Sequence, residues 1–317
     1  MLIGHGSSGT SILAILLRKY LQVCFGTESQ FIVHYDRRLG RYGDLAVPEN
    51  MRRLASDILQ ERWFVRSRKF GFRPDLEDIL GNVKKPTYRA LLDAIFGQFA
   101  RQSRMQRWGD KTPEYTGDLD VLGKLFPEAK YIHIVRDGRD VAHSTAGRYW
   151  GPKNAYVSAR QWEDTISNVL TFIRTLPPDQ VLEVRYEDLL THPRDVFRKL
   201  IRFLEIDDGD GALIAYIDEN VAGDLMPGNF NKWQNAWSHE EQLRFERVAC
   251  DNLRRYGYET TLTRCDDTFP GWQRLYWRLT NRLRKWMYPR YWADNFYKAK
   301  LRLRDLWRRL RRKPKAV

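Results

Sequence analysis

The first 23 residues constrain the fold more than any other part of the chain. The apolar start MLI, the segment GHGSSGTS and the apolar stretch 12–23 are typical of a strand, a glycine-rich loop and a helix. Residues 4–11 match the phosphate-loop pattern Gly-x-x-x-x-Gly-Lys-Ser, except that Thr10 stands in place of the Lys. Such a loop turns backbone N–H groups and a helix N-terminus toward a phosphate. Without the Lys that grips β- and γ-phosphates, it favours a ligand with one 5′-phosphate group over ATP; a plain glycine turn is the alternative.

Apolar runs that alternate with helical patterns predict the fold class. Residues 130–135 form a short apolar run typical of a buried strand, and residues 181–185 are expected to form another strand. Helical spacing of apolar residues occurs at 49–70, 86–104, 119–126, 138–149, 157–176, 193–204 and 239–256. We therefore expect an α/β fold in which helices flank a phosphate-loop-type parallel sheet.

A second motif, IVRDGRDVAHS, follows directly on the strand expected at 130–135. Arg136 ends that strand, and an Arg there lies at the ligand-binding edge of an α/β sheet. Ser144 follows eight residues later, so the two side chains can clamp a second phosphate through a bidentate guanidinium and one hydroxyl. A surface Arg followed by a capped helix is the alternative.

Positive charge is concentrated at the C-terminus. Residues 264–317 contain 17 Lys and Arg against 4 acidic residues, whereas residues 1–263 contain 37 against 36. Apolar residues recur at helical spacing within 272–286 and 292–310, and five of the eleven tryptophans lie in this region. We expect a body of residues 1–263 and a tail, 264–317, with two basic amphipathic helices.

Such a tail suits an anionic membrane surface, which residues 272–312 would contact. The alternative is that the apolar stripes pack on the body or on a second copy in a homodimer. We expect no nucleic-acid partner, because the body contains no recognised nucleic-acid-binding motif.

The cysteines and the hydropathy of the chain indicate a compartment. Three widely spaced cysteines, Cys24, Cys250 and Cys265, predict neither a disulfide framework nor a Cys-x-x-Cys metal site. No apolar run reaches the ~18 residues of a membrane span, and the N-terminus does not match a signal peptide. We expect a cytoplasmic protein, peripheral on the inner face of the membrane.

Five blocks in order resemble the sulfotransferases that use 3′-phosphoadenylyl sulfate (PAPS), over most of residues 1–260. The loop SSGTS resembles the family's 5′-phosphosulfate loop, and VRDGRDVAHS resembles its 3′-phosphate motif. The other three blocks are GDKTPEY at 109–115, VRYEDLLTHP at 184–193 and GNFNKW at 228–233. The resemblance implies sulfuryl transfer from PAPS, with no metal required, to a hydroxyl or amine of a carbohydrate or glycolipid. Residues 31–105 would form a helical insertion that shapes the acceptor pocket.

The resemblance also implies which residues bind the donor. Contacts to the 5′-phosphosulfate fall on Ser7, Ser8, Gly9, Thr10 and Ser11, and contacts to the 3′-phosphate on Arg136 and Ser144. Ser7 stands where the family usually has Arg or Lys, so Lys111 is expected to carry more of the charge near the sulfuryl oxygens. Ile12 replaces a Trp that stacks on adenine in other members. Tyr186 is a candidate for that stacking, and a buried structural Tyr is the alternative.

Catalysis requires a base and a cation near the transferring group. Glu28 occupies the place of a Glu in carbohydrate-type sulfotransferases and is the expected base, with His34 and His5 as alternatives. Lys111 is expected to stabilise the bridging or sulfuryl oxygens. Two other functions stay open: a catalytically weak, membrane-associated protein that binds PAPS or another nucleotide, and a nucleotide-kinase-like enzyme of the same fold.

Overall fold

The computed structural model describes residues 1–293 and 296 and divides into two compact units. Unit 1 comprises residues 1–137 and 164–231. Unit 2 comprises residues 138–163 and the described residues from 232 onward. The boundary expected at residue 263 lies inside unit 2. That boundary followed the change in charge along the sequence, whereas the two units are defined by their packing.

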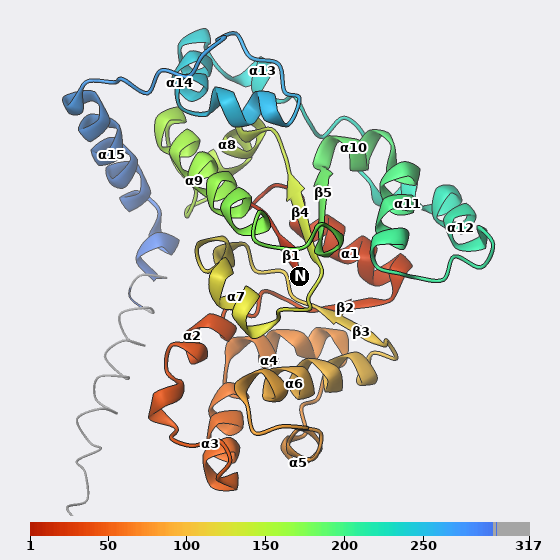
Figure 1. Ribbon diagram of the computed structural model, residues 1–317. Helices are drawn as coiled ribbons and strands as arrows, with labels where there is room; N and C mark the ends of the chain where they lie inside the picture. The colour runs from red at the N-terminus through yellow and green to blue at the C-terminus, as the bar shows by residue number, and fades with distance from the viewer. Residues whose placement is uncertain (294–295, 297–317) are drawn as a thin grey trace, which may run out of the picture. The chain divides into compact units, whose positions relative to one another are not determined.

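Unit 1 contains the strands, all of which pair in parallel (Figure 1). One sheet has the order β1 (Leu2–Ile3), β4 (Tyr131–Val135), β5 (Val181–Arg185). A second pair is formed by β2 (Val23–Phe25) and β3 (Arg107–Gly109). The two sheets meet where β3 ends: Leu2 bridges Lys111 in parallel, and the Leu2 N–H donates to the Asp110 carbonyl at 3.0 Å. The predicted α/β class with a parallel sheet is confirmed.

The strands differ in how clearly the sequence pattern predicts them. All five residues of β4 are buried, which explains why four of them are apolar. The strands β2 and β3 were not predicted, because each has only three residues. The first helix was expected to continue to Val23 but ends at Leu21, because Gln22 adopts a left-handed conformation with φ of +52° and turns the chain into β2.

Helices surround these strands in unit 1. They are α1 (Thr10–Leu21), α2 (Ile32–Asp36), α3 (Pro48–Ile58), α4 (Arg62–Ser67), α5 (Leu76–Gly81), α6 (Tyr88–Gln102), α7 (Leu119–Leu125), α10 (Tyr186–Thr191), α11 (Pro193–Phe203) and α12 (Ala212–Asn220). Short 3₁₀ helices lie at Leu39–Arg41, Arg68–Phe70, Pro113–Gly117, Pro178–Gln180 and Val221–Asp224. The expected helical insertion at 31–105 contains α2 to α6.

The single helix predicted over 49–70 is wrong, because the chain turns between α3 and α4. Ile58 and Trp63 are both buried in the same apolar cluster. On one straight helix they would point about 140° apart. The extended backbone of Glu61, with ψ of 151°, brings both side chains into the core.

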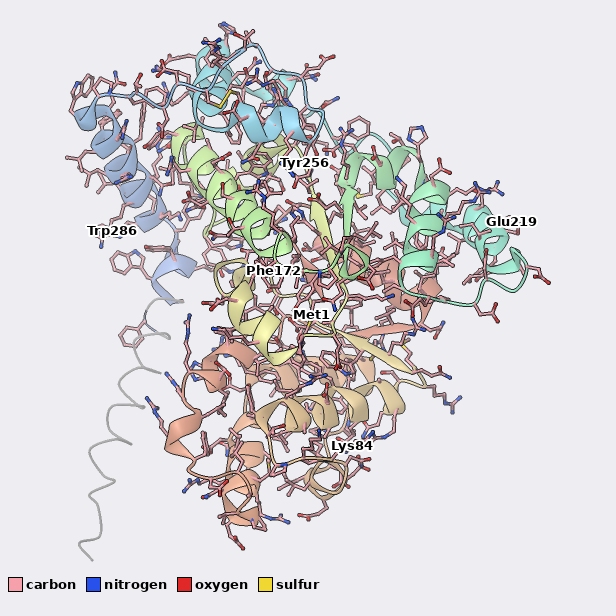
Figure 2. The ribbon with its side chains drawn as sticks, in the orientation of Figure 1. Met1, Lys84, Phe172, Glu219, Tyr256 and Trp286 are labelled. Carbon is pink, nitrogen blue, oxygen red and sulfur yellow. A yellow bond between two sulfur atoms is a disulfide. The ribbon has the colours of Figure 1, made fainter. Side chains whose placement is uncertain are left out.

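Unit 2 is helical. It contains α8 (Gly138–Ala146), α13 (Trp233–Ala236), α14 (His239–Arg255) and α15 (Gly271–Trp286). The helix α9 (Ala155–Ile173) begins in unit 2 and continues into unit 1. The first predicted tail helix corresponds to α15, and Figure 2 labels Trp286 at its end. The second, at 292–310, lies almost wholly outside the described residues. None of the helices described is long and apolar enough to cross a membrane.

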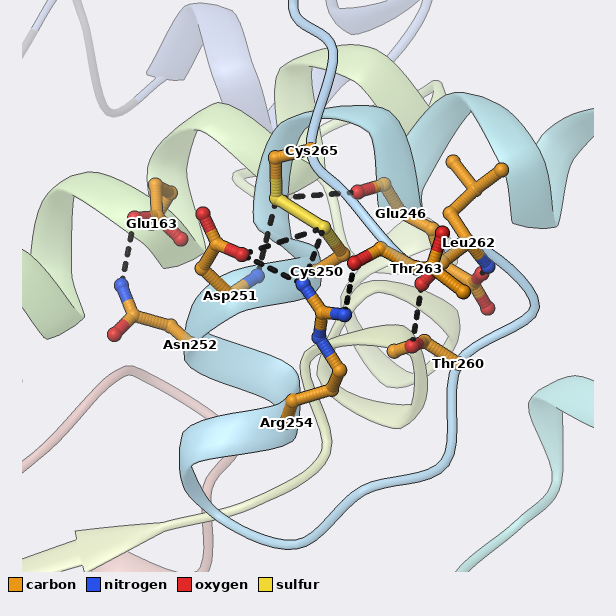
Figure 3. A network of polar contacts seen from close by, with 10 residues as sticks. All are labelled: Glu163, Glu246, Cys250, Asp251, Asn252, Arg254, Thr260, Leu262, Thr263 and Cys265. Carbon is orange, nitrogen blue, oxygen red and sulfur yellow. Dashed lines mark hydrogen bonds and ion pairs between the residues drawn. A yellow bond between two sulfur atoms is a disulfide. The ribbon is translucent and has the colours of Figure 1, made fainter.

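The expectation that the cysteines form no disulfide is wrong for one pair. Cys250 on α14 and Cys265 form a disulfide, with Cα atoms 5.4 Å apart (Figure 3). The segment after α14 folds back because the Glu246 carboxylate accepts N–H groups of Thr261 and Leu262 at 2.8 and 3.1 Å. Cys24 is free and buried. Asp251 and the two disulfide cysteines form the one His/Cys/Asp/Glu group close enough for a metal in the described part of the chain.

Candidate active site

The segments that follow all five strands of unit 1 supply polar groups to one edge of its parallel strands. After β1 comes the loop that ends at Gly9, after β2 Glu28, after β3 Lys111, after β4 Arg136 and after β5 Tyr186. Within each sheet the strands are parallel, so their carboxyl ends lie at the same edge, and the parallel bridge between Leu2 and Lys111 joins the two sheets there. Ligands of open α/β sheets bind outside these carboxyl ends.

The loop before α1 has the geometry of an anion site. Ser7 and Gly9 both adopt left-handed backbone conformations, with φ of +70° and +95°. A Cβ on Gly9 would lie 2.3 Å from a ring carbon of Tyr186, so only glycine fits there. No side chain among the described residues caps α1, and its first turn contains no acidic residue. The N-terminal N–H groups of α1 can therefore receive an anionic ligand.

Lys111 lies between the loop and Glu28. Its ammonium contacts Glu28 Oε1 at 2.7 Å and the Ser11 hydroxyl at 3.2 Å. Lys111 is 8% exposed, whereas the Glu28 side chain is 33% exposed. The cation is thus largely shielded from water, and the carboxylate keeps access to a second reactant.

A buried network fixes the backbone on both sides of this ion pair. The Ser29 N–H donates to the Thr112 hydroxyl at 2.9 Å, and the Ser29 and Tyr115 hydroxyls bond at 2.9 Å. The Tyr115 hydroxyl also accepts the N–H of Ile32 at 3.0 Å. These bonds tie the segment after β2 to the segment after β3. They therefore set the position of Glu28 relative to Lys111.

Asp110, next to Lys111, is buried beneath this network. Burial raises the pKa of Asp110 to about 6, and hydrogen bonds from the side chains of Ser29 and Thr112 partly oppose that rise. Its backbone carbonyl pairs with Leu2 of β1. Asp110 therefore supports the residues of the site and is not part of its exposed surface.

Arg136 connects three segments of unit 1. Its guanidinium donates to the backbone carbonyls of Ser7 at 3.2 Å and Asn229 at 2.8 Å. It also lies over the Tyr186 ring, 4.6 Å from the centroid, and the Asn229 side-chain amide donates to the Tyr186 hydroxyl at 2.7 Å. Sequence reasoning did not single out Asn229, although it lies in the GNFNKW block that could have indicated it.

The other predicted site residues are placed as follows. Ser8 is buried in the loop, Thr10 is buried at the first position of α1, and Ser11 beside it is exposed. Tyr186 is 4% exposed, between Gly9 and Arg136, so its ring supports the loop and its contact with adenine stays a prediction. Ser144 lies half-buried on α8 of unit 2, and its pairing with Arg136 also stays a prediction.

The two alternative bases have different surroundings. His5 lies in the loop, where its Nδ1 is 2.7 Å from the Gly6 carbonyl oxygen, and burial lowers its pKa. His34 is exposed on α2 and contacts Arg38 and Tyr35. Of the three candidate bases, Glu28 is the one in contact with Lys111.

Comparison with known proteins gives a family. A sequence model described as the sulfotransferase family matches residues 1–210. Protein-tyrosine sulfotransferase 1 of Danio rerio is 28% identical over 180 residues, which are 55% of this chain and 50% of that protein. Omega-hydroxy-beta-dihydromenaquinone-9 sulfotransferase Stf3 of Mycobacterium bovis is 30% identical over 111 residues, which are 31% of this chain and 28% of that protein. The chain thus spans half or less of these two relatives.

A solved structure shares the fold. The sulfotransferase domain of the Synechococcus PCC 7002 olefin synthase aligns with a TM-score of 0.51 and 22% identity, covering 81% of this chain and 94% of that domain. At this level of identity the likeness concerns the fold alone.

Proposed function

This chain belongs to the sulfotransferase family, and from that premise we propose that it transfers the sulfuryl group of PAPS to an acceptor hydroxyl by in-line displacement. One observation carries the proposal: the Lys111 ammonium contacts both Ser11 of the anion-binding loop and the Glu28 carboxylate. A cation and a base are thus adjacent at the place where the loop would present the 5′-phosphosulfate.

The donor would be held by its two phosphate groups. Backbone N–H groups of the loop and of the start of α1, which no described side chain caps, suit the 5′-phosphosulfate. Arg136 and Ser144 would bind the 3′-phosphate. In the structure the guanidinium donates to two neutral carbonyls, and phosphate oxygens would make stronger, charge-assisted hydrogen bonds in their place.

The chemical step would proceed as one displacement at sulfur. Glu28 accepts the proton of the acceptor hydroxyl as its oxygen bonds to sulfur, and the bond from sulfur to the 5′-phosphate oxygen breaks. 3′,5′-ADP leaves, and negative charge develops on the bridging oxygen. An ammonium has three N–H donors. Among the described residues, Lys111 uses two of them on Glu28 and Ser11, so the third can stabilise that oxygen.

Two classes of hydroxyl acceptor have support. The resemblance of Glu28 to the base of carbohydrate-type members favours a sugar or glycolipid hydroxyl. The curated relatives named protein-tyrosine sulfotransferases favour the phenolic hydroxyl of tyrosine. A carboxylate base with partial exposure suits either one.

We also propose that the enzyme works at an anionic membrane surface on a lipid-linked acceptor. The support is the excess of 17 Lys and Arg over 4 acidic residues in 264–317, together with the tryptophans there. A homodimer formed through the same residues is the competing interpretation.

Calorimetric titration with 3′,5′-ADP, with ADP as the comparison ligand, tests donor recognition. Tight binding of 3′,5′-ADP and weak binding of ADP are expected. Transfer of [³⁵S]sulfate from PAPS to a tyrosine peptide and to a glycolipid then identifies the acceptor class. Lys111→Ala should abolish transfer, and Lys124→Ala, which removes an exposed lysine of α7, should not. A preference for ADP, or full transfer by Lys111→Ala, would refute the proposal.

A further inference from the structure

The helix α15 displays a row of large apolar side chains to solvent. Trp272, Leu275, Tyr276, Leu279, Leu283 and Trp286 are each at least 45% exposed. At 100° per residue, these six positions fall within an arc of about 100° on the helix. The row therefore forms one continuous apolar stripe, which we name the outer stripe.

A different face of α15 holds the helix to the rest of unit 2. Trp277 is 9% exposed, and its ring centroid lies 4.9 Å from those of Tyr156 and Phe269. The Asn154 amide donates to the Trp277 carbonyl at 2.8 Å, and the Lys153 N–H donates to the Asn281 side chain at 2.7 Å. Since these contacts fix the helix, the outer stripe is not required for its packing.

The charges on α15 indicate what covers the stripe. The helix α15 contains five cations and no acidic residue. Arg278 and Arg282 are exposed and fall beside the stripe on the helical arc, and the Arg282 guanidinium lies 5.9 Å from the Trp286 ring centroid. Aromatic rings at headgroup depth with flanking cations are the pattern of a helix that lies in the plane of an anionic bilayer.

We propose that the outer stripe of α15 is the surface that inserts into an anionic membrane, while Trp277 and Asn281 keep the helix attached to the rest of unit 2. The inference rests on the proposed membrane location and specifies the face that makes the contact. A neutral apolar groove of a partner would match the stripe but not the exposed Arg278 and Arg282 beside it. The stripe and the charge together fit anionic lipid.

Vesicle sedimentation of the full chain tests the proposal. We expect the wild type to sediment with vesicles of phosphatidylserine and phosphatidylcholine, not with phosphatidylcholine alone, and to be released by salt. Leu283→Glu should lower partitioning by about tenfold or more, because it places a charge in the apolar contact. The matched control is Val65→Glu on α4, which changes a side chain of similar exposure, 62% against 58%, outside the stripe.

Two further measurements separate the outcomes. Both variants should keep the wild-type melting temperature and the wild-type affinity for 3′,5′-ADP, so a lost membrane contact is distinguishable from a failure of donor binding. The proposal is overturned if the wild type ignores anionic vesicles or if the two variants lose equally. It is also overturned if sedimentation velocity shows that Leu283→Glu dissociates a dimer, since the stripe would then be a subunit interface.

Discussion

Asp110 should make the stability of the protein fall as the pH rises from 4 to 6. Burial raises its pKa in the folded protein from the usual 3.8 to about 6. Between these values the folded state binds a proton that the unfolded state has lost, so the stabilising contribution is complete below pH 4 and is lost above pH 6. A difference of that size corresponds to about 3 kcal/mol, or about 1.4 kcal/mol for each pH unit within the window.

The substitution Asp110→Asn removes this titration and keeps a carbonyl oxygen for the hydrogen bonds of Ser29 and Thr112. Its stability relative to the wild type should therefore rise by about 3 kcal/mol between pH 4 and pH 7. Urea unfolding followed by tryptophan fluorescence, at four pH values, measures the difference. Asp179→Asn, which alters an exposed carboxylate, should follow the wild type. A stability difference between Asp110→Asn and the wild type that is equal at pH 4.5 and pH 7 would refute the assigned burial cost.

Three substitutions test the donor site and the base. Arg136→Ala should weaken binding of 3′,5′-ADP by about 10- to 100-fold, as expected for hydrogen bonds to a charged group, whereas Arg198→Ala on the exposed face of α11 should leave calorimetric affinity unchanged. Glu28→Gln should lower kcat by about 100-fold with donor affinity retained; an equal loss of affinity would indicate a structural role. Gly9→Ala should strongly weaken donor binding, because its φ is +95° and its Cβ would meet Tyr186, whereas Gly40→Ala has no atom within 4 Å and should bind normally.

Part of the candidate site could be predicted from the sequence because two of its motifs have a recognisable local pattern. The glycine-rich loop predicts the turn into α1. Arg136 directly follows a five-residue, mainly apolar strand that the sequence pattern alone predicts. Glu28 and Lys111 follow strands of three residues, which are too short to show a periodic pattern. Only the family resemblance singled them out. Their contact depends on the pairing of β2 with β3, which local patterns do not predict.

The cysteine pattern failed to predict the disulfide for a related reason. Cys250 and Cys265 are 15 residues apart, and their number and spacing match no disulfide framework. Their approach depends on the buried carboxylate of Glu246, which pairs with Arg139 at 2.8 Å and also accepts the N–H groups that turn the chain back. Because disulfides persist in oxidising compartments, the cysteines no longer support a cytoplasmic location.

The contacts of Arg136 show why Asn229 escaped sequence reasoning. The guanidinium binds Ser7 and Asn229 through their backbone carbonyls, and every residue type has such a carbonyl. The contact, which joins segments 93 residues apart, therefore leaves no side-chain signal of its own, and only the GNFNKW block could have indicated Asn229. The Asn229 side chain adds a bond to the Tyr186 hydroxyl, and the Tyr186 ring in turn packs against Gly9. Asn229 thus stabilises, through Tyr186, the loop conformation that the proposed donor requires. Substitutions at Asn229 should therefore weaken donor binding indirectly, through Tyr186 and Gly9.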